Sequence, residues 1–128
     1  MTRLALGFVL ASLLAVSAKA DPSPCLRKKD VTALRETLKR SPGFDDDRVR
    51  DLKQSMAFTS ICSEQVAEIL GAFDTDDGKL KALKLLARPL VDPGNTAAIV
   101  AAFSFSDGQS AAAAILSDER RRRRSAPQ

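Results

Sequence analysis

The sequence contains no histidine, no tryptophan and no tyrosine, and phenylalanine, at six positions, is its only aromatic residue. Histidine is the usual general base near neutral pH and the commonest metal ligand, so its absence argues against catalytic triads and zinc sites. The shortage of aromatic rings leaves little to stack against single-stranded nucleic acid, so no nucleic-acid partner is expected. With no catalytic constellation in the chain, we expect neither enzymatic activity nor a cofactor.

Long apolar runs are also missing, except at the start of the chain. A positive start at Arg3, an apolar stretch over residues 4–16 and alanines on either side of Lys19 are the layout of a secretory signal peptide. The apolar stretch is too short to span a bilayer stably. We therefore predict that residues 1–20 are removed and that the chain is exported, periplasmic or extracellular, and not membrane-spanning after processing. A retained membrane anchor is the alternative.

The processed chain, residues 21–128, is long enough for one domain with a modest core. Loss of Arg3 and Lys19 lowers the formal charge from +4 to +2. Five consecutive arginines near the C-terminus contribute more positive charge than this net value. The basicity therefore belongs to the end of the chain. We predict an N-terminal segment over residues 21–29, a helical repeat domain over 30–117 and an Arg-rich disordered tail over 118–128.

The two cysteines, Cys25 and Cys62, both lie in the processed chain. An exported chain with an even number of cysteines favours a disulfide, and only one pairing is available. Two unpaired thiols are the alternative. A redox-active pair is not expected, because the cysteines do not form a Cys-x-x-Cys arrangement.

The chain repeats itself at a period of about thirty residues. "QVAEILGAF" (65–73) aligns with "NTAAIVAAF" (95–103), and "FDTDDGKLKALKLL" (73–86) aligns with "FSFSDGQSAAAAIL" (103–116). An earlier copy, "PGFDDDRVRDLK" (42–53), matches residues 73–84 at an offset of 31, so that Phe44, Thr75 and Phe105 share one position. Self-similarity at this period is typical of helical repeats.

Each repeat unit is predicted to contain an acidic turn, a helix, a second turn and another helix. Val49, Leu52 and Met56 have the spacing of one helical face, and residues 80–87 follow the same pattern. Upstream, Asp30 is predicted to cap the first helix. Alternating β-branched residues are nearly absent, so no strands are expected. The sequence predicts an all-α fold of about six helices of about 10–14 residues, stacked as antiparallel pairs in a compact bundle or a short solenoid.

The stretches "FDDDRVRDLK", "FDTDDGKLKALKLL" and "FSFSDGQSAAAAIL" resemble the family known as domain of unknown function 4476. The resemblance covers about residues 42–116. In the last stretch Ser106 and Gln109 replace acidic or basic positions. The resemblance implies a helical domain in exported proteins and transfers no activity or catalytic residue.

Closely spaced aspartates precede two of the predicted helices. A calcium loop of the EF-hand type starting at Asp74 needs glycine at position six and glutamate at position twelve. Gly78 stands at position five and Leu85 at position twelve, so an EF-hand is excluded. A looser metal site at Asp74, Asp76 and Asp77 is the alternative to a structural role.

Helix capping is the favoured interpretation of these turns. A short polar side chain before a helix accepts hydrogen bonds from unpaired backbone amides, and carboxylates in the first turn interact well with the helix dipole. We therefore predict Asp45 and Asp76 as caps of the helices that follow them. Ser63 is predicted to cap the helix that carries Val66, Ile69 and Leu70. Asp92 or Asn95 is predicted to cap the next helix.

Two basic features are candidates for anion binding. Lys81, Lys84 and Arg88 form a stripe opposite the leucines, which is more typical of a solvated helix face. The predicted tail would be a multivalent anion binder, whose targets would be lipid phosphates, acidic envelope polymers or an acidic protein. Its residues are Arg120, Arg121, Arg122, Arg123 and Arg124. A solvated tail with no dedicated partner is the favoured alternative.

Two functions fit these patterns. We favour an exported, non-enzymatic helical-repeat protein that binds an unknown protein partner over its stacked helices. The alternative is a binder of an anionic envelope component through the Arg-rich C-terminal tail, with the helices as scaffold. An enzyme that uses two aspartates as acid and base would need a cleft that brings the carboxylates together.

Overall fold

The computed structural model describes residues 24–125, which form six α-helices. The predicted signal peptide, residues 1–20, and the last three residues of the chain lie outside this range. An isolated bridge between Ile61 and Leu90 joins the segments that precede α4 and α6. The prediction of an all-α fold is confirmed. The helices are α2 (Lys28–Arg40), α3 (Asp45–Ser55), α4 (Ser63–Leu70), α5 (Asp76–Leu86), α6 (Ala97–Ala101) and α7 (Ser106–Ser125).

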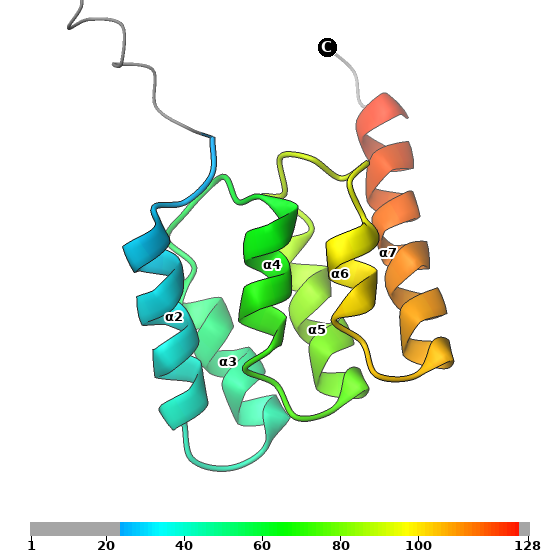
Figure 1. The fold of residues 1–128 in the computed structure, drawn as a ribbon. Coiled ribbons are helices and arrows are strands. Elements are labelled where there is room, and N and C mark those ends of the chain that lie inside the picture. The colour runs from blue at the N-terminus through cyan, green and yellow to red at the C-terminus, as the bar shows by residue number, and fades with distance from the viewer. Residues whose placement is uncertain (1–23, 126–128) are drawn as a thin grey trace, which may run out of the picture.

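The helices form two adjacent rows (Figure 1). One row contains α2, α4 and α6, the other contains α3, α5 and α7, and consecutive helices pack across the rows as the pairs α2–α3, α4–α5 and α6–α7. Within the described residues, neither helix of the first pair contacts a helix of the third. In the described residues, each pair thus contacts only the pair next to it.

The apolar faces expected from the sequence line the space between the rows. Leu52 of α3 and Leu83 of α5 are fully buried, and Val49 packs against the same core. Phe73 and Phe103, which share a position in the aligned repeats, are 4% and 2% exposed after α4 and α6. No helix in residues 24–125 is long and apolar enough to cross a membrane.

Helix lengths vary more than the repeat predicts. α4 has 8 residues, α6 has 5 and α7 has 20. α6 is short because a turn, in which the amide of Asn95 donates to the carbonyl of Asp92 (2.9 Å), occupies the segment before it. α2 begins at Lys28, inside the predicted N-terminal segment 21–29. The predicted disordered tail is wrong for residues 118–125, which continue α7 as an ordered helix.

A disulfide ties the N-terminal segment to the start of α4. Cys25 and Cys62 are bonded across 37 positions, with their Cα atoms 5.1 Å apart, which confirms the predicted pairing. Beside the disulfide, the amide of Leu26 donates to Oε1 of Gln65 (3.0 Å), and Nε2 of Gln65 donates to the carbonyl of Leu26 (2.7 Å). The segment before α2 is therefore held by a covalent bond and two hydrogen bonds.

Candidate functional site

Asp45 is buried and binds the next repeat unit. It is the first residue of α3 and is 9% exposed. Its Oδ1 accepts a hydrogen bond from the amide of Asp74 (3.0 Å), and its Oδ2 accepts from the amide (2.8 Å) and hydroxyl (2.7 Å) of Thr75. Arg48 donates to the same carboxylate (2.9 Å). Asp45 thus fixes the turn that precedes α5.

Asp76 makes the equivalent contact one unit later. Its Oδ1 accepts from the amide of Ser104 and its Oδ2 from the amide of Phe105, both at 2.9 Å. Asp45 and Asp76 share one position in the aligned repeats, 31 residues apart. Both carboxylates join the start of one helix to the start of the next helix in the same row, so α3, α5 and α7 begin at a common edge (Figure 1).

Two glycines make room for these carboxylates. A Cβ atom on Gly78 would lie 2.6 Å from Cγ of Asp45, and one on Gly108 would lie 2.9 Å from Cγ of Asp76. In the first unit the corresponding residue is Asp47, whose Oδ2 accepts from a backbone amide of its own unit (3.1 Å). We call these two contacts, Asp45 with Gly78 and Asp76 with Gly108, the inter-repeat carboxylate contacts.

The pKa of both carboxyl groups is lowered. Burial alone raises the pKa of Asp45, but the hydrogen bonds that it accepts from the next unit and from Arg48 outweigh burial and bring the pKa below its ordinary value. For Asp76 the amide of Ser104 has the largest effect and lowers the pKa; burial opposes it, and the amide of Phe105 and the charge of Lys79 lower it further.

Stability is therefore expected to fall in acid. A carboxyl whose pKa is lower in the folded state stabilises the protein above its unfolded-state pKa, and this stability is lost as the pH falls through the folded-state value. We expect the free energy of unfolding to decline as the pH drops below about 4. The double variant Asp45→Asn, Asp76→Asn should be less stable at neutral pH and should show a shallower decline. Urea unfolding across pH tests this, and equal slopes for the two proteins would contradict it.

The prediction that Asp45, Asp76 and Ser63 cap their own helices is wrong. Each is the first residue inside its helix. Thr75, one residue before α5, is the residue that caps this helix, because its side chain accepts from the amide of Gly78 (3.0 Å). A residue at the cap position has extended backbone angles that direct its side chain back to the first-turn amides. A residue one position later does not, and its side chain is free to reach a neighbouring unit.

Ser63 is itself bound by a residue far along the chain. Oδ1 of Asp92 accepts from the amide (2.9 Å) and the hydroxyl (3.0 Å) of Ser63. Asp92 thus serves the start of α4, and neither it nor Asn95 caps α6, whose cap position is held by Thr96 without a side-chain bond. Asp30, predicted as a cap, lies in the first turn of α2.

The candidate metal ligands face different partners. Asp74 contacts Arg48 (3.0 Å), Asp77 lies 3.6 Å from Lys81, and Asp76 is engaged by the following unit. The three carboxylates do not converge. Across the part of the chain that the structure describes, no group of three Asp, Glu, Cys or His side chains is placed to hold a metal ion.

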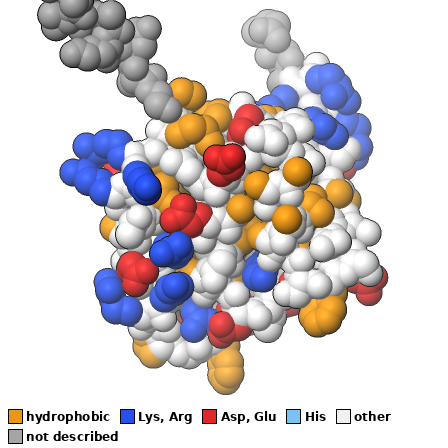
Figure 2. Space-filling model, in the orientation of Figure 1, with side chains coloured by type: hydrophobic (Ala, Val, Ile, Leu, Met, Phe, Trp, Pro, Cys, Tyr) orange, Lys and Arg blue, Asp and Glu red, His pale blue; other side chains and the backbone are white. Residues whose placement is uncertain are grey.

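Two phenylalanines are exposed at the edge where α3, α5 and α7 begin. Phe44 directly precedes α3 and is 84% exposed, and Phe105 directly precedes α7 and is 72% exposed. Figure 2 shows hydrophobic side chains that protrude from this lower edge. A shallow groove beside Phe44 is also lined by Asp46 and Asp74. We call this surface the phenylalanine edge.

The lysine stripe of α5 is divided between two environments. Lys81 donates to Asp46 of the preceding unit (2.8 Å), and this contact and Asp77 raise its pKa above the ordinary value. Lys84 and Arg88 are exposed, and a shallow groove of about 300 Å³ between α5 and α7 is lined by these two residues and by Arg122. Only the second half of the stripe is therefore free to meet an anion.

The arginines of α7 are partly engaged within the fold. Arg122 (2.9 Å) and Arg123 (3.0 Å) both pair with Glu119, which is 4% exposed. Arg123 also donates to the carbonyls of Ala87 (3.0 Å) and Arg88 (3.1 Å) at the end of α5. These bonds satisfy carbonyls that a helix end leaves unpaired, and they explain why the arginines continue α7. Arg121 pairs with Asp118.

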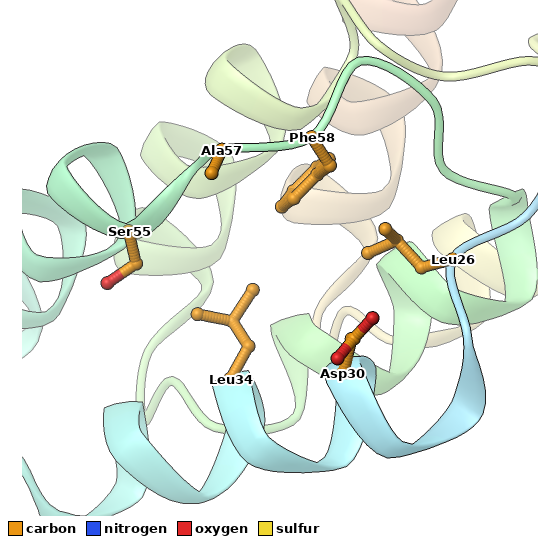
Figure 3. Close-up of a pocket in the computed structure, with 6 residues that line it drawn as sticks. All are labelled: Leu26, Asp30, Leu34, Ser55, Ala57 and Phe58. Atoms are coloured by element: carbon orange, nitrogen blue, oxygen red, sulfur yellow. The ribbon is translucent and has the colours of Figure 1, made fainter.

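A separate apolar groove lies beside α2, near the disulfide. Figure 3 shows Leu26, Leu34 and Phe58 around a common space, with Asp30 and Ser55 on its wall. Its volume of about 340 Å³ is at the lower end of the range for ligand pockets. It offers an apolar anchor and little polar chemistry.

Sequence reasoning missed Gln65 and assigned Asp92 and Arg123 other roles. Asp92, Gln65 and Arg123 act on residues 29, 39 and 36 positions away, respectively, and nothing local in the sequence marks these contacts. The roles of Gly78 and Gly108 were accessible, because the repeat alignment places both glycines at one position and the two bonding aspartates at another.

The comparisons with known proteins give one result. The family described as Domain of unknown function (DUF4476) matches residues 26–116. No curated protein and no solved structure matches the chain. The matched span runs from the residue after Cys25 into α7 and includes both inter-repeat carboxylate contacts. Because the match covers more than half of the chain, the protein belongs to the DUF4476 family.

Proposed function

We propose that the chain is an exported, non-enzymatic helical-repeat protein that binds another protein through the phenylalanine edge. The observation that carries this proposal is the exposure of Phe44 and Phe105. At the position before a helix the fold favours Ser, Thr, Asp or Asn, and Thr75 holds that position in the middle unit. Exposed phenylalanines give the fold nothing there, whereas aromatic side chains are frequent anchors at protein interfaces.

The edge is held in place before any partner arrives. The amide of Phe44 donates to Asp47 (3.1 Å), and that of Phe105 donates to Asp76 (2.9 Å). A backbone that is already ordered loses little conformational entropy on binding. The two rings are therefore displayed on fixed supports rather than on loose loops.

The charges around the rings indicate the chemistry of the partner. Asp46, Asp77 and Asp107 occupy the same position in successive units and are all exposed. Asp46 and Asp77 share the single cation Lys81, so the three positions keep a net negative charge. A partner that offers apolar pockets flanked by Lys or Arg would match this edge, because complementary charge steers association and fixes register.

Export is supported by the disulfide, since such bonds persist in oxidising compartments and are rare in the cytosol. The absence of enzymatic activity is supported by the carboxylates at the edge. Asp45 is occupied by backbone amides and Arg48, and Asp74 by Arg48. Neither is left as an acid or base for a substrate.

The double variant Phe44→Ser, Phe105→Ser tests the protein-binding function. The immobilised chain is exposed to envelope extract at high salt, and the captured protein is identified, purified and titrated against each variant. We expect the double variant to lose at least tenfold in affinity, since aromatic anchors contribute about 2 kcal/mol or more. Its melting temperature should be unchanged or higher, because serine is a better cap.

Val91→Ser, at an exposed apolar position outside the edge (37% exposed), is the matched control and should bind as the unmodified chain does. If the purified partner binds the double variant with full affinity, the phenylalanine edge is not its site.

A second function, binding of an anionic envelope component, is favoured by a different observation. Lys84, Arg88, Arg120 and Arg124 are exposed and have no ion-pair partner among residues 24–125. They lie at the ends of α5 and α7, where Arg123 holds the two helices together. The cations therefore lie on an ordered surface, although the sequence predicted that the arginines of α7 belong to a disordered tail.

A further inference from the structure

The end of the molecule opposite the phenylalanine edge carries cations on both its first and its last helix. Because α2 and α3 fold back through a short loop, the start of α2 lies at the same end as the last turns of α7 (Figure 1). Figure 2 shows Lys and Arg side chains at both upper corners of the molecule. We call this surface the basic end; its residues are Lys28, Lys29, Arg88, Arg120 and Arg124.

The cations at the start of α2 have no structural explanation. Lys28 and Lys29 are the first two residues of the helix, and Arg27 precedes them. Cations in the first turn oppose the helix dipole and cost stability. Arg27 pairs with Asp30 (3.1 Å), but Lys28 and Lys29 are exposed and have no ion-pair partner within residues 24–125. Asp30 is the acidic residue of this turn and is engaged by Arg27, so two unpaired cations remain at a helix start that they weaken. Such a feature points to a function.

The end of α7 also keeps charges that the fold does not neutralise. Arg120 and Arg124 are four residues apart, so they share one face of the helix, where like charges repel. The acidic residues of this helix end, Asp118 and Glu119, pair with Arg121, Arg122 and Arg123. The face that carries Arg120 and Arg124 is therefore left free for an external anion.

The position of the two clusters selects an extended ligand. They belong to α2 and α7, which do not contact each other, so one small anion cannot reach both. The groove beside Arg122 is poorly suited to a lone phosphate, because Asp118 and Glu119 line it as well. Cations at two corners of one end match a flat surface with many negative charges, such as a bilayer of anionic phospholipids.

We propose that the basic end binds the phosphate headgroups of an anionic lipid bilayer, so that the start of α2 and the last turns of α7 both contact the bilayer surface. This inference rests on the second function proposed above and names its ligand. The phenylalanine edge then faces away from the bilayer, about 30 Å distant along α7, which has 20 residues at about 1.5 Å per residue. The orientation leaves that edge accessible to a protein partner.

Vesicle co-sedimentation tests the proposal. The chain is purified from an oxidising compartment with its disulfide formed and its N-terminus established by mass spectrometry. We expect binding to vesicles that contain phosphatidylglycerol, no binding to pure phosphatidylcholine vesicles, and loss of binding at high salt. Inorganic phosphate at millimolar concentration should not compete; full competition would indicate a single-anion site and overturn the proposal.

Charge reversal at each corner tests whether both helices contact the surface. Lys28→Glu, Lys29→Glu and, separately, Arg120→Glu, Arg124→Glu should each weaken binding about thirtyfold or more, since each cation near such a surface contributes about fivefold. The α2 variant should melt at the same temperature or higher, because its new charges suit the helix dipole. Lys39→Glu, Arg40→Glu is the control: it makes the same charge change at the other end of α2 and should lose less than threefold.

The outcomes separate the two proposals. If only the α7 variant loses binding, the arginines act alone; the second function then stands, and the two-cornered lipid surface is wrong. If both corner variants bind as the control variant does, or if phosphatidylcholine vesicles bind equally well, the lipid proposal is wrong, and the second function then requires an anionic component other than a bilayer.

Discussion

Removal of the Cys25–Cys62 disulfide is expected to lower the free energy of unfolding by about 3–4 kcal/mol. The bond closes a loop across 37 positions, so breaking it gives the unfolded chain a large gain in entropy. In the folded state it also holds Leu26 beside Gln65. This loss is a large part of the total stability expected for a domain of this size.

Urea unfolding of the double variant Cys25→Ala, Cys62→Ala measures this effect. The unmodified chain in reducing agent should lose a similar amount, whereas the double variant should not respond to reducing agent. A loss below about 1 kcal/mol would show that the disulfide is not a main source of stability.

Gly78→Ala is expected to destabilise the protein by about 2–4 kcal/mol. In an exposed helix the same change normally stabilises by up to about 1 kcal/mol. Here the new Cβ would lie 2.6 Å from Cγ of Asp45. It would displace a buried carboxylate from the amides of Asp74 and Thr75 and from Arg48. The charge would then stay buried without its partners, which is costly.

Gly94→Ala is the control for this prediction, because a Cβ atom on Gly94 would meet nothing within 4 Å. Its effect on the free energy of unfolding should stay within about 0.5 kcal/mol. A Cβ atom on residue 78 would also lie 2.6 Å from Cβ of Asp45, so the clash is removed only when Asp45→Gly is combined with Gly78→Ala. These two changes should be strongly non-additive in a double-mutant cycle. Additive effects, or a Gly78→Ala variant as stable as the unmodified protein, would contradict the proposed role of the inter-repeat carboxylate contacts.

The all-α fold and much of its core were predictable because they depend on local patterns. The spacing of Val49, Leu52 and Met56 marks one face of α3, and the structure packs that face against the core. The disulfide was predictable from the number of cysteines and the expected compartment. Membership of the family followed from the acidic turns and the leucine-rich stretches after them.

The candidate surfaces were less predictable. The exposure of Phe44 and Phe105 depends on where the units stack, and the repeat alignment, which places both residues at one position with Thr75, does not reveal it. The arginines were expected to form a disordered tail, yet Arg123 bonds to a carbonyl at the end of α5, 36 positions away in the chain. Its bond to this carbonyl is available only after α5 and α7 have packed together.

The sequence by itself determined the helices, their apolar faces and the period of about thirty residues, because 3.6-residue spacing and turn chemistry act over a few neighbouring residues. Only the tertiary structure decided which turn each acidic side chain serves. Asp45 and Asp76 stand where a local cap is expected, yet each bonds the next unit. A carboxylate binds whichever unpaired amides lie within about 3 Å, and stacking of the repeats brings the amides of the following turn into that range.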